Sequence, residues 1–249
     1  KDAGSNDATV TLKNVGTTTS VLVDARIGIT VTANTSQTKV YGTVDPALTY
    51  SFTPSLESGD SFTGSLSRAI GENVGTYTIE QGTLSANAKY KITFVSKDFT
   101  ITPKAITVTA DAKTKVYGTP DVTLTHTVSP SLVGSDVLTG TLSRTTGENV
   151  GSYAIASTLA NSNYAITYVP ANYVITPKAI TVTADAKTKV YGTPDAALTY
   201  TVSPSLVGSD VLAGTLTRTT GENVGTYAIA STLANSNYAI TYVPANYVI

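Results

Sequence analysis

The chain has 249 residues, with 16 Lys and Arg against 17 Asp and Glu, and it contains no Cys, Met or Trp. The lack of cysteine excludes disulfides, thiolate metal sites and cysteine nucleophiles. The balanced charge, with no long block of one sign, argues against a nucleic-acid or anionic-membrane surface. Because 41% of the residues are hydrophobic and only 13% are charged, we expect folded modules with a weakly charged surface.

An internal repeat organises the sequence. Residues 104–175 and 178–249 align without gaps at an offset of 74 and differ at six of 72 positions. A more diverged copy begins near Ile27 and carries the same Tyr-Gly-Thr and Gly-Glu-Asn-Val-Gly strings, with Tyr and Gly 30 residues apart. Residues 1–26 do not fit the repeat and are predicted to be linker strands or the end of a preceding module. The repeat predicts three domains, over 27–103, 104–177 and 178–249.

Short strands are the predicted elements along the chain. Residues 7–13 and 20–24 are two candidate strands around the turn-like Asn14-Val15-Gly16. At the start of the second repeat, the apolar residues of 106–110 alternate with threonines, which is the pattern of a strand buried on one face. No apolar run approaches the roughly 20 residues that a membrane helix needs.

The rest of the second repeat follows the same pattern. A strand over 124–128 ends before Pro130, which cannot donate to a strand ladder. Further predictions are at most one helical turn in 131–138, a hairpin of 140–144 with 151–157, and strands over 164–168 and 173–175. Each copy is therefore expected to hold five or six short strands with minimal helix.

The connection between repeats is short. Thr176 to Ala179 join the second repeat to the third, and Pro177 restricts its own φ and that of the residue before it. We expect stiffly coupled neighbours and an elongated rod, on the order of 90 Å for three domains. Domains of this size bury only about 60% of their unfolded surface, so we expect contacts between neighbouring repeats to supplement each core.

Three ordered motifs at fixed spacing suggest a family. They are Lys115-Val-Tyr-Gly-Thr-Pro-Asp121, Gly147-Glu-Asn-Val-Gly151 and Tyr173-Val-Ile-Thr-Pro177. With these motifs, residues 27–249 resemble the MBG-type repeats of bacterial surface and two-partner-secreted haemagglutinin-like adhesins. The resemblance implies a mainly β, β-grasp-like fold in tandem array, export to the bacterial cell surface and an adhesin context.

Candidate catalysts are scarce. His126 is the only histidine, and Tyr50 and Tyr200 occupy its place in the other repeats. Since a tyrosine replaces neither an imidazole base nor an imidazole ligand, we interpret His126 as a structural ring on a strand. The sequence therefore predicts no catalytic, cofactor-binding or metal-binding residues, no cofactor and no enzyme activity.

Three weaker readings remain open. The acids of the second repeat, Asp111, Asp121, Asp136 and Glu148, form no calcium-loop motif and are assigned to turns or caps, although a calcium site could assemble in space. A Lys–Asp or Lys–Asn isopeptide bond is a second reading, but Lys113 and Lys115 lie in a polar stretch and are expected to be solvated. The 15 tyrosines could stack on sugars, yet their alternation favours core edges.

Two functions compete. The leading hypothesis is a structural stalk, a spacer that projects a binding region of a large secreted adhesin from the cell surface. The alternative is a repeated glycan- or protein-binding module that acts by multivalency, for which an exposed aromatic patch should recur in every copy. The expected partners are the neighbouring repeats, with host or matrix molecules bound by other regions, and the chain is expected to be a monomer without membrane insertion.

Overall fold

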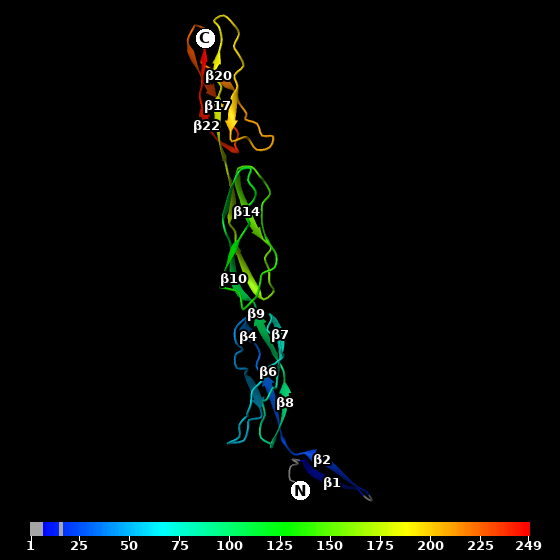
Figure 1. The fold of residues 1–249 in the computed structure, drawn as a ribbon. Helices are drawn as coiled ribbons and strands as arrows, with labels where there is room; N and C mark the ends of the chain where they lie inside the picture. Colours follow the sequence, from blue (N-terminus) through cyan, green and yellow to red (C-terminus); the bar gives the residue numbers. More distant parts are fainter. Residues whose placement is uncertain (1–6, 15–16) are drawn as a thin grey trace. The chain divides into compact units, whose positions relative to one another are not determined.

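The computed structural model describes residues 7–14 and 17–249 (Figure 1). Side chains are described from Asp24 onward. The described part contains strands and no helix, so no membrane-spanning helix is found in it. Strands β1 (Asp7–Asn14) and β2 (Thr17–Asp24) pair antiparallel, which confirms the two strands predicted there. The turn predicted at Asn14-Val15-Gly16 falls partly outside the described residues.

Each repeat contains seven strands, more than the five or six predicted. The first repeat holds β3 (Ile27–Ala33), β4 (Gln37–Val40), β5 (Tyr50–Thr53), β6 (Ser67–Arg68), β7 (Gly75–Glu80), β8 (Tyr90–Val95) and β9 (Asp98–Thr102). The second holds β10 (Lys104–Ala110), β11 (Lys113–Val116), β12 (His126–Ser129), β13 (Leu142–Arg144), β14 (Gly151–Ser157), β15 (Tyr164–Val169) and β16 (Asn172–Thr176). The third holds β17 (Lys178–Ala184), β18 (Lys187–Thr188), β19 (Tyr200–Ser203), β20 (Leu216–Arg218), β21 (Thr226–Ser231), β22 (Tyr238–Val243) and β23 (Asn246–Val248).

The strands of each repeat form two small sheets with the same order in all three copies. In the first repeat, a three-stranded sheet has the order β5-β3-β8 and a four-stranded sheet the order β4-β9-β7-β6. β3 runs antiparallel to β5 and parallel to β8, while β9 runs parallel to β4 and antiparallel to β7. The prediction of a mainly β array of three small domains is confirmed.

The predicted alternation of apolar residues and threonines determines which side chains form the core. In β3, Ile29, Val31 and Ala33 are buried, while the threonines between them are partly exposed. The equivalent residues of β10 and β17 are buried in the same way. Ala110 of β10 belongs to the same buried cluster as Ile155 and Tyr173 of the four-stranded sheet. Packing apolar residues between two sheets leaves the threonines on the outside, which explains the low charge of the sequence.

The strand that the sequence analysis missed is β11, with its counterparts β4 and β18. Its sequence, Lys-Thr-Lys-Val, carries two charges in four residues, which is the composition of a polar stretch. It pairs in parallel with β16 and places Lys115 inward, so that this lysine is only 7% exposed. The expectation that Lys115 is solvated is therefore wrong.

A single proline separates consecutive repeats. β9 ends at Thr102 and β10 begins at Lys104, while β16 ends at Thr176 and β17 begins at Lys178. The chain divides into two compact units, and the first of them reaches Ile106 and also takes in residues 131–137 and 160–166 of the second repeat. These segments and residues 104–106 form one end of the second repeat, its leading end, which thus groups with the first repeat.

The Gly-Glu-Asn-Val-Gly turn depends on its first glycine. The first glycine of each turn has a φ near +150° and lies against a tyrosine ring: Gly71, Gly147 and Gly221. A Cβ at Gly147 would lie 2.4 Å from Tyr153 Cε1. The last glycine of each turn (Gly75, Gly151 and Gly225) has no such φ, and a Cβ there would meet atoms only at 3.8 Å or beyond.

Changing the first glycine of all three turns to alanine should destabilise the protein by more than about 1 kcal/mol per repeat, since both the backbone and the ring oppose a Cβ. The matched control changes the last glycine of all three turns, which should cost far less. Thermal unfolding followed by circular dichroism compares the two. Equal melting temperatures for the two triple variants would contradict this account.

Candidate functional sites: an ion-pair cluster and the junctions between repeats

Each repeat buries two cations among two carboxylates. In the second repeat, Lys115 on β11 contacts Asp121 in the following loop at 2.6 Å and also binds Glu148. Arg144 on β13 donates to the same two carboxylates, with Nε 2.8 Å from Asp121 Oδ2. Counterparts make the same pairs in the other repeats: Lys39, Asp45, Arg68 and Glu72, then Lys189, Asp195, Arg218 and Glu222.

The arginine of each cluster also lies over two aromatic rings. Arg144 Cζ is 5.3 Å from the ring centroid of Tyr153 and 5.2 Å from that of Tyr173. Arg218 and Arg68 make the same contacts with the equivalent rings. A planar guanidinium suits both stacking and paired hydrogen bonds, so a lysine would not replace it.

The cluster holds all of its members charged. The hydrogen bonds of Arg144, then those of Lys115, lower the pKa of Asp121 to about 2. Burial lowers the pKa of Lys115, but its bonds to Asp121 and Glu148 outweigh burial and raise it. The pKa of Glu148 is lowered by Lys115 and Arg144. In the other repeats, Asp45 and Asp195 also have a pKa of about 2.

The charge states of the cluster bear on whether Lys115 forms an isopeptide bond. The structure does bring Lys115, Asp121 and Glu148 together, which the sequence analysis did not expect. However, condensation needs a neutral amine as nucleophile, and the raised pKa of Lys115 keeps that amine protonated at neutral pH. The arrangement therefore favours ion pairs over a covalent cross-link.

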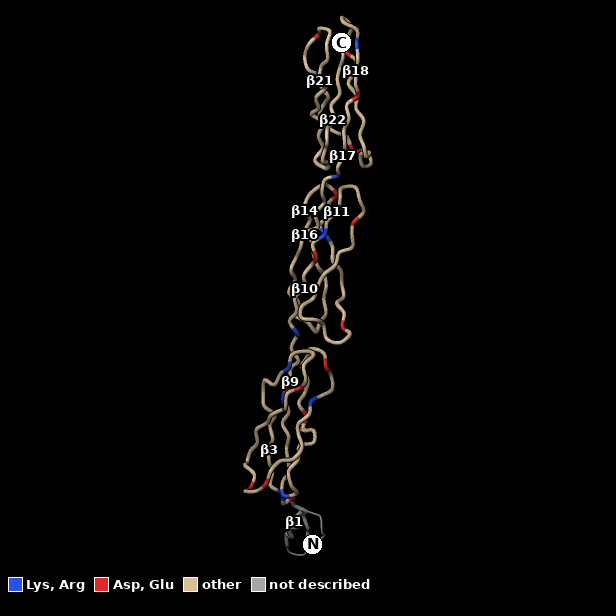
Figure 2. Tube along the Cα trace, turned by 60° about the vertical axis from the view of Figure 1, so that its left-hand side comes forward, with Lys and Arg blue, Asp and Glu red and all other residues tan. Residues whose placement is uncertain are grey.

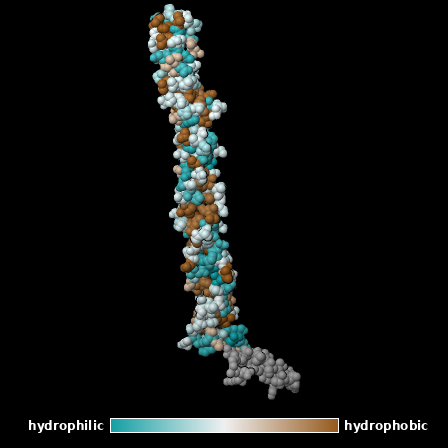
Figure 3. Space-filling model, in the orientation of Figure 1, coloured by the Kyte–Doolittle hydropathy of each residue, from teal (hydrophilic) through white to brown (hydrophobic). Residues whose placement is uncertain are grey.

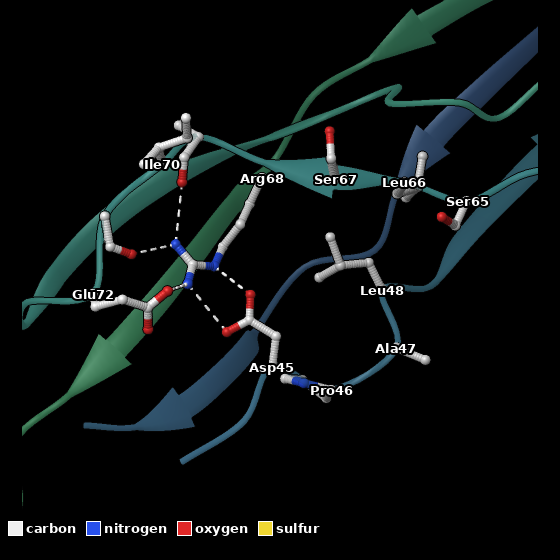
Figure 4. Close-up of a pocket in the computed structure, with 12 residues that line it drawn as sticks. Asp45, Pro46, Ala47, Leu48, Ser65, Leu66, Ser67, Arg68, Ile70 and Glu72 are labelled. Carbon is white, nitrogen blue, oxygen red and sulfur yellow. Dashed lines mark hydrogen bonds and ion pairs between the residues drawn. The ribbon is translucent and has the colours of Figure 1, made fainter. Parts of the chain in front are cut away.

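A surface pocket of about 760 Å³ adjoins the cluster of the first repeat (Figure 4). The guanidinium of Arg68 lies in its wall and donates to Asp45, to Glu72 and to the carbonyls of Ala69 and Gly71. All five N–H groups of an arginine are used by these bonds. The pocket thus offers no spare guanidinium donor to an anionic ligand.

The second and third repeats have a tyrosine–amide hydrogen bond beside the cluster that the first repeat lacks, because both of its partners are replaced there. Tyr247, which is fully buried, accepts a bond from the Ala196 amide at 2.8 Å, and the second repeat has the same contact. In the first repeat these two positions are Phe99 and Pro46. Phenylalanine lacks the acceptor and proline lacks the donor, so neither group is left unsatisfied.

The junction between the first two repeats is built from two tyrosines and an aspartate. Tyr41 and Tyr164 both donate to Asp136, and the Tyr41 bond is 2.8 Å long. The rings meet edge to face with centroids 5.5 Å apart, and Tyr41 is 9% exposed. The bond to Asp136 raises the pKa of Tyr41. A Cβ at Gly42 would lie 2.4 Å from Val133, so only glycine allows this approach.

A buried asparagine completes that junction. Asn163 is 9% exposed and accepts a 2.9 Å bond from the Val74 amide, while its own amide donates to Asn73 at 3.0 Å. Both groups that it contacts belong to the Gly-Glu-Asn-Val-Gly turn of the first repeat. The side chain is therefore satisfied on both of its ends across the junction.

The second junction repeats these contacts. Tyr117 donates to Asp210 at 2.8 Å and meets the ring of Tyr238 edge to face. Asn237 bonds the Val150 amide and Asn149 at 2.9 and 3.0 Å. Apolar residues of both repeats form one buried cluster here, which includes Tyr117, Ile175, Ile180, Leu212 and Tyr238.

The histidine and the acids that the sequence offered as candidate catalytic or metal-binding residues are not gathered at one site. His126 is half-buried on β12 and pairs with Ala110 across the sheet. Asp111 accepts a bond from Thr125, whereas the other acids of this repeat serve the cluster and the first junction. In the part of the chain that the structure describes, no three His, Asp or Glu side chains are grouped to hold a metal ion. Figure 2 shows how sparse the charged positions are along the trace.

Comparison with known proteins gives a clear match. The family model of the MBG domain (YGX type) matches three times in tandem, over residues 29–100, 106–174 and 180–248. The Tyr-Gly-Thr string of each repeat lies inside a matched segment. No curated protein matches the chain.

Acid should weaken the protein between pH 4 and 2. The folded pKa of about 2 for Asp45, Asp121 and Asp195 lies below the ordinary value of 3.8, so the stabilisation is complete above pH 4 and is lost as the pH falls toward 2. Melting temperatures measured from pH 6 to 2 should fall within that window.

The control for this titration changes the cluster arginine of every repeat to methionine, which keeps an unbranched stem and removes the guanidinium charge. Its carboxylates should titrate closer to their ordinary range, so the melting temperature should fall less between pH 4 and 2. A decline as large as that of the unmodified chain would contradict the assignment.

A double-mutant cycle tests the tyrosine contact. Tyr247→Phe alone should destabilise the third repeat by about 1 kcal/mol, because the Ala196 amide loses its partner. In an Ala196→Pro background the same change should be nearly neutral, since no donor remains. Hydrogen exchange of the third repeat reports both differences. The same cost in both backgrounds would show that the hydrogen bond is not responsible.

Proposed function

Because this chain belongs to the MBG domain family of the YGX type, we propose that it is a spacer segment of a secreted bacterial surface adhesin. Domains of this family are structural or adhesive, and they occur in extracellular, adhesin-like surface proteins. In the proposed role, each repeat adds length between the cell and a binding region elsewhere in the protein. The segment itself needs no catalytic chemistry.

The junction contacts are the observation that carries this proposal. Each joins the end of one repeat to the start of the next through a buried asparagine, a shared aspartate and an edge-to-face tyrosine pair. A spacer must resist bending at its joints, and a one-proline connection with satisfied buried polar groups opposes bending. We therefore propose that the neighbouring repeats are the main binding partners of each domain.

The distribution of partly and fully exposed aromatic residues favours the spacer over the multivalent binding module. In the first repeat Tyr50, Phe52 and Phe62 pack together, with ring centroids 5.0 to 6.4 Å apart. Their counterparts are His126, Val128 and Leu138 in the second repeat and Tyr200, Val202 and Leu212 in the third. The group does not recur, and Figure 3 shows hydrophobic residues in separate groups on the visible face.

Small-angle scattering on chains with different repeat numbers tests the proposal. Deleting 104–177 joins Pro103 to Lys178, which restores the native Thr-Pro-Lys-Ala-Ile connection, and inserting a second copy of 104–177 lengthens the array. The maximum dimension should change by about 30 Å per repeat in both directions. A radius of gyration that grows only as roughly the 0.38 power of chain length would reject the spacer function.

A further inference from the structure

The third repeat carries a face of the same composition as those that form the two junctions. We call Tyr191, Gly192, Asn223 and Val224 its end face; the matching residues are Tyr41, Gly42, Asn73 and Val74 in the first repeat and Tyr117, Gly118, Asn149 and Val150 in the second. The identical residue types indicate the same binding chemistry.

None of the described residues covers this third end face. Tyr191 is 64% exposed, whereas Tyr41 and Tyr117 are each 9% exposed, and Val224 is 77% exposed. A Cβ at Gly192 would meet nothing within 4 Å. Within the described residues, no hydrogen bond is recorded for the amide of Val224, although the amides of Val74 and Val150 each donate to an asparagine. The third face thus has the groups of a junction without their partners.

The opposite side of a junction is the leading face, and it exists in two forms. The second and third repeats present Val, Asp, Asn and Tyr: Val133, Asp136, Asn163 and Tyr164, then Val207, Asp210, Asn237 and Tyr238. The first repeat instead presents Glu57, Asp60, Lys89 and Tyr90. Two of the four positions therefore differ in charge.

Those two differences remove the junction contacts. Lys89 replaces the asparagine, and an ammonium group accepts no hydrogen bond from a valine amide. Glu57 replaces the valine that packs against the glycine of the end face. Lys89 Nζ also lies 3.1 Å from Glu57 and 3.2 Å from Asp60, so the aspartate is already paired within the first repeat. A leading face of this form is unsuited to a tyrosine and glycine end face.

We propose that the end face of the third repeat is a docking site for the leading face of a further repeat joined in series, and that it accepts the Val, Asp, Asn and Tyr form but rejects the Glu, Asp, Lys and Tyr form. The glutamate and lysine positions thus act as a selector that sets which repeat can follow another. This rule is independent of the spacer function, because it concerns one contact and not the length of the array.

The test adds a fourth repeat to the full chain. Thr-Pro and a second copy of residues 178–249 follow Ile249, and hydrogen exchange is measured at the Val224 amide by NMR. Docking should slow exchange by about tenfold, the effect of one hydrogen bond of roughly 1.4 kcal/mol. The amides of Val74 and Val150 in the same molecule serve as internal references for an occupied face.

The matched control carries Val207→Glu and Asn237→Lys in the added copy only. Circular dichroism establishes that this copy is folded, and Val224 should then exchange as fast as in the 249-residue chain. Equal protection by both added copies would overturn the selector, and protection by neither would overturn the docking site. Val224 protection that rises with the concentration of the 249-residue chain would assign the face to a second molecule and would also overturn the proposal.

Discussion

The fold of each repeat depends on one arginine that binds two carboxylates and two aromatic rings. Arg144 joins the loop after β11 to the turn after β13, and its stacking over Tyr153 and Tyr173 ties both to the four-stranded sheet. The same carboxylates satisfy the buried Lys115, which would otherwise be an unpaired charge in a small core. In a domain that lacks disulfides, this cluster connects segments that share no strand pairing.

The junctions likewise connect one repeat to the next through buried and paired polar groups. A 74-residue domain has limited apolar surface to bury, and each junction adds a tyrosine ring and satisfied polar groups to that burial. The grouping of residues 131–137 and 160–166 with the first repeat reflects this sharing. The polar contacts give the junction direction, because its two sides present different groups: a tyrosine hydroxyl and a valine amide on the end face meet an aspartate and an asparagine on the leading face.

The sequence predicted the features that rest on local patterns. Alternation identified β10 and β15, and glycine and asparagine identified the hairpin of β13 and β14. It did not predict β11, because a strand with an inward lysine has the composition of a solvated loop until its partners are known. Of those partners, Asp121 lies in the next loop, six residues from Lys115, but Glu148 is 33 residues away, and Asp210 is 93 residues from Tyr117 across the junction. Comparing the three copies position by position is enough to find the Phe99 and Pro46 pair, because both changes occur in the same repeat.

The one-proline connection and the near-identity of the second and third repeats have a consequence for inheritance. Gain or loss of 74 residues in frame, as recombination between similar DNA segments produces, recreates the same connection and the same pair of faces. Such an event creates no new type of junction and leaves no domain without a matching neighbour. Copy number in an array of this kind can therefore drift between lineages while every individual domain keeps its stability.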